Sequence, residues 1–216
     1  MRIGITNLKG GVGKTTLTQN LAVCFAHMGY KTCIVDTDKN QNSVSWSGAR
    51  DESLPEILVV GVTDPKAVNK TVDKLHQDNE IVLIDGTPSL SEMTTRIILV
   101  SDILIIPILP SAHDVRAMGQ FFERYEQALE FRDSIPAYFF VNQFSEKYII
   151  HRSIREMLKQ FEIGIMESTF KERVSYLETA LEGMGVYEYS DKKAKAEVVK
   201  MTQEVLELAK KEGLIE

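Results

Sequence analysis

The chain has 216 residues, of which 44% are hydrophobic and 26% are charged, a composition that allows one sizeable core and excludes disorder. The formal net charge of −6 and the pI near 5.4 exclude a surface that is basic throughout, so any nucleic-acid contact has to come from a local basic patch. Cys24 and Cys33 form no Cys-x-x-Cys pair, which excludes a disulfide framework and a zinc site, and we expect both to be reduced thiols in the core.

From the first residues onward, short runs of β-branched and apolar residues alternate with longer amphipathic stretches. The strand-like runs cover residues 3–6, 32–35, 57–60, 81–84, 103–108, 137–141 and 163–166. The helix-like stretches lie near residues 14–28, 41–50, 64–78, 91–100, 113–132, 150–161, 173–182 and 191–212. Strands that are apolar throughout are buried on both faces, which is typical of a parallel sheet covered by helices. The alternation therefore predicts a doubly wound, mostly parallel α/β fold in a single domain over residues 1–216.

Two of the predicted helices carry apolar residues at alternating spacings of three and four. One stripe consists of Val115, Met118, Phe122, Tyr125 and Leu129, and the other of Val198, Met201, Val205 and Leu208. Such stripes pack against a sheet, with a contact between subunits as the alternative.

The sequence does not predict membrane attachment. The longest apolar runs, such as residues 103–109, are far too short to cross a bilayer, and no signal-peptide pattern precedes the first strand. Residues 190–216 contain six lysines against six acidic residues, so the last helix offers no cationic face to anionic lipid. We therefore expect a soluble, cytoplasmic protein.

The strongest local signal is the segment between the first strand and the first helix, Lys9-Gly10-Gly11-Val12-Gly13-Lys14-Thr15-Thr16. Such a glycine-rich loop turns successive backbone N–H groups inward, and the N-terminus of the helix adds a partial positive charge, so residues 10–16 predict a phosphate site of the Walker A type. Lys14 is expected to neutralise the β- and γ-phosphates of a nucleotide, and the Thr15 hydroxyl to bind Mg²⁺. The strict motif has a glycine at position 8, where this chain has Leu8.

Two further segments place carboxylates at the ends of strands. Asp36 and Asp38 follow the run at 32–35, and both point to the same side because side chains alternate along an extended chain. Ligands bind at the carboxyl ends of strands in an open α/β sheet, although both aspartates also suit the alternative of capping the next helix. Four apolar residues at 81–84 lead into Asp85, a Walker B pattern in which the carboxylate holds Mg²⁺ through water. Gly86 and Pro88 would shape the loop that senses the γ-phosphate.

The loop that begins at Lys9 resembles the deviant Walker A motif of the ParA/MinD class of P-loop NTPases, and the resemblance covers nearly the whole chain. The resemblance implies that Lys9 reaches across a two-fold interface and stabilises the phosphoryl group transferred on the partner. It also implies that Asp38 orients the attacking water and that Asp36 supports the Mg²⁺ shell. Asn142, at the end of the run at 137–141, resembles the residue that contacts adenine, with plain capping of the strand as the alternative.

Residues 101–111 and 171–176 are most similar to the small ParA proteins typified by ParF, which lack an N-terminal helix-turn-helix. This resemblance implies an ATPase for plasmid or chromosome partition that uses ATP, ADP and Mg²⁺ and forms ATP-dependent homodimers and higher polymers. Its ATP state would bind DNA without sequence preference on the nucleoid, and a small centromere-binding protein would stimulate hydrolysis. The candidate DNA-binding residues, for which an ordinary solvated surface is the alternative, are Lys171, Arg173, Lys192, Lys193 and Lys195.

Two alternative functions keep the same fold. The segment Asp38-Lys39-Asn40 lacks the proline of the partition family and resembles some ParA-like ATPases of conjugative DNA transfer. An ATP-dependent synthetase of the dethiobiotin or cobyrinate type shares the phosphate loop as well, but such an enzyme needs a second pocket for an organic acid, and the sequence shows no basic or glycine-rich motif for one.

Overall fold

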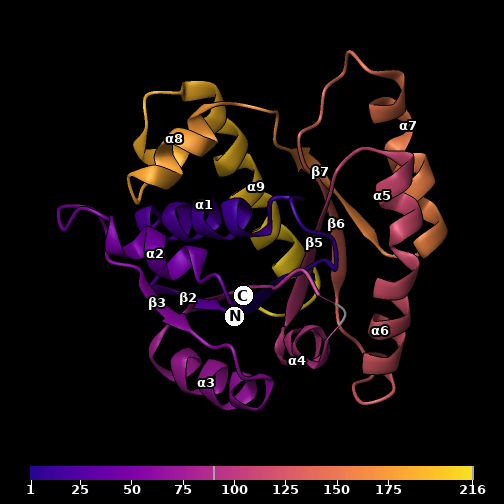
Figure 1. Cartoon of the computed structure of the whole chain (residues 1–216), viewed down its shortest axis with the longest axis horizontal. Coiled ribbons are helices and arrows are strands. Elements are labelled where there is room, and N and C mark those ends of the chain that lie inside the picture. Colours follow the sequence, from indigo (N-terminus) through magenta and orange to yellow (C-terminus); the bar gives the residue numbers. More distant parts are fainter. Residues whose placement is uncertain (90, 216) are drawn as a thin grey trace.

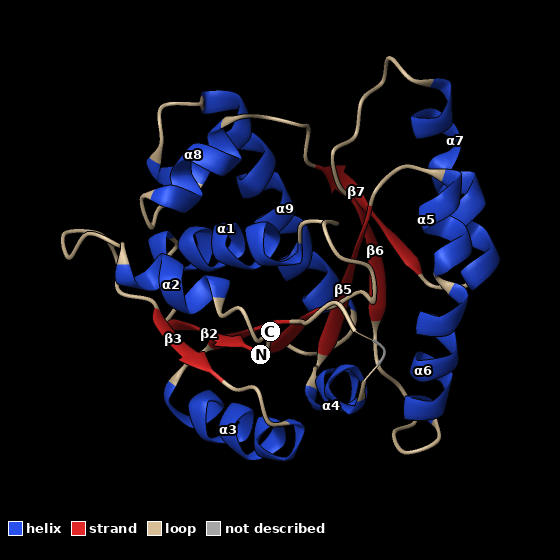
Figure 2. Ribbon diagram, viewed as in Figure 1, coloured by secondary structure: helices blue, strands red, loops and turns tan. Residues whose placement is uncertain are grey.

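The computed structural model describes residues 1–89 and 91–215. Within these residues, parallel strands form a seven-stranded sheet in the order β3-β2-β4-β1-β5-β6-β7, drawn in red in Figure 2. The strands are β1 (Arg2–Ile5), β2 (Thr32–Asp36), β3 (Leu58–Gly61), β4 (Ile81–Asp85), β5 (Ile103–Ile108), β6 (Ala137–Val141) and β7 (Gly164–Thr169). The predicted parallel α/β fold is confirmed, and each predicted strand is present with small differences at its ends.

Helices cover both faces of the sheet, so that the molecule has three layers (Figure 1). One face carries α1 (Lys14–His27), α2 (Asn42–Gly48), α8 (Ser175–Leu181), the short 3-10 helix η2 (Val186–Glu188) and α9 (Lys192–Lys211). The other face carries α3 (Pro65–Asp78), α4 (Glu92–Val100), α5 (Ala112–Ala117), α6 (Gly119–Leu129), α7 (Ile149–Leu158) and η1 (Lys159–Phe161).

Alternate side chains of the central strands supply separate cores on the two faces. Ile3 and Ile5 of β1 are buried in the core beneath α1 and α9, whereas Leu104 and Ile106 of β5 are buried beneath the helices of the opposite face. Burial on both faces explains why these strands are apolar at successive positions rather than at every second one. The two predicted helical stripes also lie in these cores: the one that begins at Val115 packs on one face, and the one on α9 packs on the other.

The predicted helix over residues 113–132 is the main difference between the sequence analysis and the structure. It is divided into α5 and α6 at Met118, whose backbone N–H bonds to the carbonyl of Val115, three residues back, instead of four. Gly119 follows at once and begins the second helix. Glycine is among the poorest helix formers, which favours a break at this position.

The carboxyl ends of β1, β2 and β4 meet at one edge of the sheet. Pairing of Ile5 with Asp85 and of Asp36 with Asp85 places the loop after β1 beside both acidic strand ends. The strand order reverses direction about β1, which pairs with β4 on one side and β5 on the other, and ligands bind in open α/β sheets at such a reversal. No helix of the described residues is long and apolar enough to cross a membrane.

We predict that both cysteine thiols are unreactive in the native protein. Cys24 and Cys33 are at most 1% exposed, and burial raises the pKa of the Cys33 thiol to about 12. At pH 8 only about one Cys33 side chain in ten thousand is then ionised, and the thiolate is the reactive form. A disulfide reagent such as DTNB should modify neither thiol in buffer and both in guanidinium chloride.

An engineered cysteine at the exposed position of Ser134 provides the control, because it should react in the native state at the rate of a free thiol. Rapid modification of the unsubstituted native chain would contradict the burial of these thiols.

Candidate nucleotide-binding site

The glycine-rich loop joins β1 to α1 and lines a cavity of about 450 Å³. Gly11 and Gly13 adopt positive φ angles of 75° and 93°, which glycine adopts without steric cost. Gly13 precedes α1, whose first turn contains no acidic residue and whose N-terminus has no side-chain cap. The N–H groups of this helix end therefore have no competing side chain and are available to an anion such as a phosphate group.

Lys14 lies on the floor of this cavity with an exposed fraction of only 6%. Its Nζ donates a hydrogen bond to the backbone carbonyl of Lys9 at 2.8 Å, so the ammonium is held by the loop itself. Burial lowers the pKa of Lys14 to about 8, although the nearby Asp85 and Asp38 carboxylates oppose this shift. The positive charge is thus incompletely balanced, and a bound phosphate group would stabilise it.

Asp85 ends β4 and connects two helices through its carboxylate. Oδ1 accepts a hydrogen bond from the Thr15 hydroxyl at 3.2 Å, and Oδ2 accepts one from the Ser43 hydroxyl at 2.8 Å. Burial is the larger cause, and the charge of Asp36 the second, that together raise the pKa of Asp85 to about 7. A divalent cation here would relieve the cost of ionising this carboxylate.

The oxygen atoms around Asp85 fit Mg²⁺ rather than a softer metal. Thr15 and Asp85 are the side chains that could hold it, directly or through water, and the phosphate groups of a nucleotide would supply further oxygen ligands. The described residues contain no group of three or more His, Cys, Asp or Glu side chains placed to hold a metal ion.

Asp36 accepts hydrogen bonds from three backbone N–H groups. Its Oδ1 accepts the N–H of Asp38 at 3.0 Å, and its Oδ2 accepts the N–H groups of Ser43 at 2.8 Å and Val44 at 3.2 Å. The bonds from Ser43 and Val44 are those of the helix-capping alternative, because these two residues lie at the start of α2. A direct part for Asp36 beside Mg²⁺ stays a prediction, and its charge already acts on the neighbouring Asp85.

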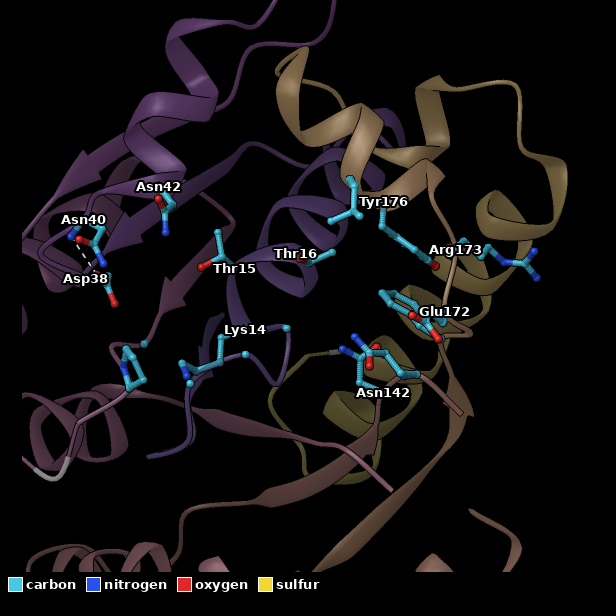
Figure 3. Close-up of a pocket in the computed structure, with 18 of the residues that line it drawn as sticks. Lys14, Thr15, Thr16, Asp38, Asn40, Asn42, Asn142, Glu172, Arg173 and Tyr176 are labelled. Atoms are coloured by element: carbon cyan, nitrogen blue, oxygen red, sulfur yellow. Dashed lines mark hydrogen bonds between the residues drawn. The ribbon is translucent and has the colours of Figure 1, made fainter. Parts of the chain in front are cut away.

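Asp38 lies at the rim of the cavity, partly exposed, and its carboxylate accepts the N–H of Asn40 at 2.8 Å. Figure 3 shows Asp38 and Asn40 on one side of the cavity, Tyr176 and Asn142 on the other, and Lys14 between them. Asp38 and Asp36 therefore differ in environment although they are two residues apart, since only Asp38 lines the cavity.

Asn142 lines the cavity, and its amide holds the phosphate loop. Its Nδ2 donates to the carbonyl of Val12 at 2.8 Å, and its Oδ1 accepts the N–H of Gln143 at 2.9 Å. The side chain thereby connects the end of β6 to the loop after β1. Contact with adenine stays a prediction. It would have to use the second N–H of Nδ2 or the second lone pair of Oδ1, which these two hydrogen bonds leave over.

The five candidate DNA-binding residues have unequal environments. The Arg173 guanidinium pairs with Glu197 at 2.6 Å and lies 4.0 Å from Asp191, and the Lys195 ammonium sits 3.7 Å from the centre of the Tyr187 ring. Lys171, Lys192 and Lys193 are exposed. The last two begin α9, which lies beside α8 in Figure 1, and the three exposed lysines form the more accessible part of the predicted patch.

Sequence reasoning missed two features of the site. Ser43 is not predicted as a partner of Asp85, although its place two residues after the Asp36–Gln41 segment is a possible signal. The loop between β7 and α8 supplies Phe170 and Glu172 to the wall of the cavity, and α8 supplies Leu177, whereas the sequence pattern points to this segment as part of the family resemblance and as a candidate DNA surface.

We predict that Gly13→Ala destabilises the fold more than Gly11→Ala. A Cβ atom at Gly13 would lie 2.2 Å from Asn142 Nδ2, which the bond to Val12 holds in place, whereas a Cβ at Gly11 meets nothing within 4 Å. Positive φ alone costs a non-glycine residue about 1–2 kcal/mol, and the crowding at Gly13 adds about 1–3 kcal/mol. Chemical denaturation would measure both values.

The double variant Gly13→Ala, Asn142→Ala should recover much of the added cost, since the crowded atom is removed. Equal stability of the two single variants would contradict the close approach of Asn142 to the loop.

Comparison with known proteins agrees with this geometry. Residues 3–186 match the family described as the CobQ/CobB/MinD/ParA nucleotide binding domain. The chain is 26% identical over 190 residues to the maintenance of carboxysome distribution protein A of Halothiobacillus neapolitanus, with 86% of each chain covered. It is 25% identical over 176 residues to the protein ParA of Rhizobium radiobacter, with 80% of this chain and 78% of that protein covered.

Among solved structures, the chain is similar to the septum site-determining protein MinD of Pyrococcus horikoshii in complex with Mg-ADP. The TM-score is 0.77 at 20% identity, and 99% of each chain is covered. The match over residues 3–186 shows that this chain belongs to the CobQ/CobB/MinD/ParA family of nucleotide-binding domains.

Proposed function

We propose that this protein is an ATPase that dimerises around ATP and segregates DNA, as ParA-type partition proteins do. The observation that carries the proposal is the contrast between the two lysines of the phosphate loop. Lys14 faces the cavity, whereas the Lys9 ammonium lies 2.5 Å from Asp114, a residue that borders a neighbouring cavity. Phosphate binding within one chain needs only Lys14, so Lys9 is available for the nucleotide of a partner.

Binding of ATP would use the loop and the start of α1. The N–H groups of residues 10–16 would surround the β- and γ-phosphates, and Lys14 would transfer its hydrogen bond from the Lys9 carbonyl to phosphate oxygen. Thr15 and Asp85 would hold Mg²⁺, which supplies positive charge beside the transferring phosphoryl group. The Mg-ADP in the Pyrococcus MinD structure supports this assignment of cofactors.

Hydrolysis would depend on Asp38 and on both lysines. Asp38 is a partly exposed carboxylate at the rim of the cavity, and it would accept a hydrogen bond from water and align that water for in-line attack. Lys14, and Lys9 from the partner chain, would balance the negative charge that the phosphoryl oxygens carry during transfer.

In this proposal the cargo is DNA, which the ATP dimer binds without sequence preference. A relative described as a probable plasmid-partitioning protein ParA of Thermus thermophilus supports this choice. A small centromere-binding protein would stimulate hydrolysis and so end DNA binding. The ATP state would therefore be found on the nucleoid. Lys171, and Lys192 and Lys193 at the start of α9, are the exposed cations of the candidate set that would contact duplex phosphates.

We predict that Asp38→Ala separates dimerisation from hydrolysis. The variant should bind ATP and form a long-lived dimer, while the turnover rate falls by a factor on the order of 10²–10⁴, the usual contribution of a group that positions or activates water. Sedimentation and phosphate release measure the two properties.

Lys14→Ala is the control for Asp38→Ala, because it should lose nucleotide binding altogether. Loss of a charge-assisted contact costs about 1.5–3 kcal/mol, and Lys14 would make more than one such contact. An Asp38→Ala protein that turns over normally would remove Asp38 from the mechanism.

We predict that DNA binding by the ATP dimer falls steeply with salt and does not depend on sequence. Each phosphate that the protein neutralises adds about −0.9 to the slope of log K against log salt concentration. Replacing Lys192 and Lys193 together with glutamine should make this slope shallower and leave dimerisation intact. Lys66→Gln is the control, since this exposed lysine lies on α3, on the opposite face of the sheet.

An ATP dimer with no affinity for any duplex at low salt would overturn the DNA cargo. The cargo would then be a protein assembly, as the name of the Halothiobacillus relative indicates for that protein. Absence of both DNA binding and dimerisation would instead favour the synthetase alternative.

A further inference from the structure

The ion pair between Lys9 and Asp114 joins the start of the phosphate loop to α5. The two groups lie 2.5 Å apart, with the Lys9 side chain 34% exposed and the Asp114 side chain only 4% exposed. Such a pair is stronger than one on the open surface, because the carboxylate is largely withdrawn from water.

The Asp114 carboxylate is fixed by its own segment. Ser111 caps α5: its hydroxyl donates to Asp114 Oδ2, and the Asp114 N–H donates back to Ser111 Oγ at 3.1 Å. The remaining oxygen, Oδ1, is buried, and among the described residues its one charged neighbour within 4.0 Å is the Lys9 ammonium. Movement of Lys9 therefore leaves a buried carboxylate oxygen without its partner, which opposes that movement.

The backbone of Lys9 is also held, so only its side chain can move. Its N–H donates to Asn7 Oδ1 at 3.0 Å, and the buried Asn7 side chain is in turn anchored to the carbonyl of Pro107 at 2.8 Å. The Lys9 ammonium can leave Asp114 by rotation about its side-chain bonds while the phosphate loop keeps its shape.

We propose that Asp114 is a positioning residue that holds the Lys9 ammonium within its own chain and thereby sets the concentration of ATP-bound protein at which dimers form. The inference rests on the proposed function, in which Lys9 acts on the nucleotide of the partner. The phosphate groups of that nucleotide compete with Asp114 for the same ammonium. Two Lys9–Asp114 pairs have to open in each symmetric dimer, so the factor by which one pair raises the dimer dissociation constant enters twice and is squared.

The test is Asp114→Asn, which keeps the shape of the side chain and its contact with Ser111 but removes the charge that holds Lys9. We expect the dimer dissociation constant, measured by sedimentation with AMPPNP and Mg²⁺, to fall by at least about tenfold, because even an exposed pair holds its lysine by a factor of roughly three to five and two pairs open. The affinity of the monomer for ADP should not change. Asp133→Asn is the matched control, since it removes the same charge from an exposed loop position.

A double-mutant cycle identifies Lys9 as the group through which Asp114 acts. In a Lys9→Ala background, Asp114→Asn should have no effect on dimerisation. Asp114→Ala should repeat the result of the asparagine variant, and circular dichroism of each variant shows whether the fold is intact. Dimers of Asp114→Asn that are as weak as the wild type, or weaker, would overturn the proposal.

Failure of the proposed function gives a different result. If Lys9→Ala dimerises and hydrolyses ATP as the wild type does, Lys9 has no role at a partner site and the function itself is contradicted. If Lys9→Ala is defective and Asp114→Asn is unchanged, only the role of Asp114 is lost.

Discussion

The arrangement of the site depends on the hydrogen bonds that the Asp85 carboxylate accepts. Strand β4 lies between β1 and β2, so the end of β4 is next to both the phosphate loop and the segment that leads into α2. Hydrogen bonds from Thr15 and Ser43 fix the starts of α1 and α2 to this one side chain. The Asp85 backbone carbonyl also accepts both the N–H and the hydroxyl of Thr37, which holds the end of β2.

This position has an electrostatic cost that a cation would offset. The pKa of Asp85 is raised from 3.8 to about 7, so its charged form opposes folding: the fold is most favoured by this group below pH 4 and loses that contribution as the pH rises through 7. The Lys14 ammonium, with its pKa lowered, lies in the same cavity. A nucleotide with its divalent cation brings opposite charges to both groups at once, which explains how binding can stabilise a site that is under strain without it.

The sequence predicted those parts of the site that depend on local pattern. Each strand end that carries a candidate carboxylate could be found because a continuous apolar run stops there, and the glycine loop could be found because its spacing is local. The contacts of Ser43 with Asp85, of Asp114 with Lys9 and of Arg173 with Glu197 could not be found in this way. These pairs join positions that are far apart in the chain, and nothing in the local composition of either segment specifies its partner.

The number of basic residues alone does not show which of them could contact DNA, because long-range ion pairs decide which cations are free to do so. A count of lysines and arginines treats each cation as equivalent, but Arg173 is balanced by Glu197 within the chain, and its guanidinium would have to leave that carboxylate before it could neutralise a phosphate. Lys192 and Lys193 carry no such cost, although Asp191, which caps α9, places a negative charge beside them. A single chain therefore presents a small patch of cations on an acidic protein. Two such patches brought together by a nucleotide-dependent dimer would double the number of phosphate contacts, and because the free energies of these contacts add, DNA affinity would depend on the nucleotide state even if no residue of the patch moved.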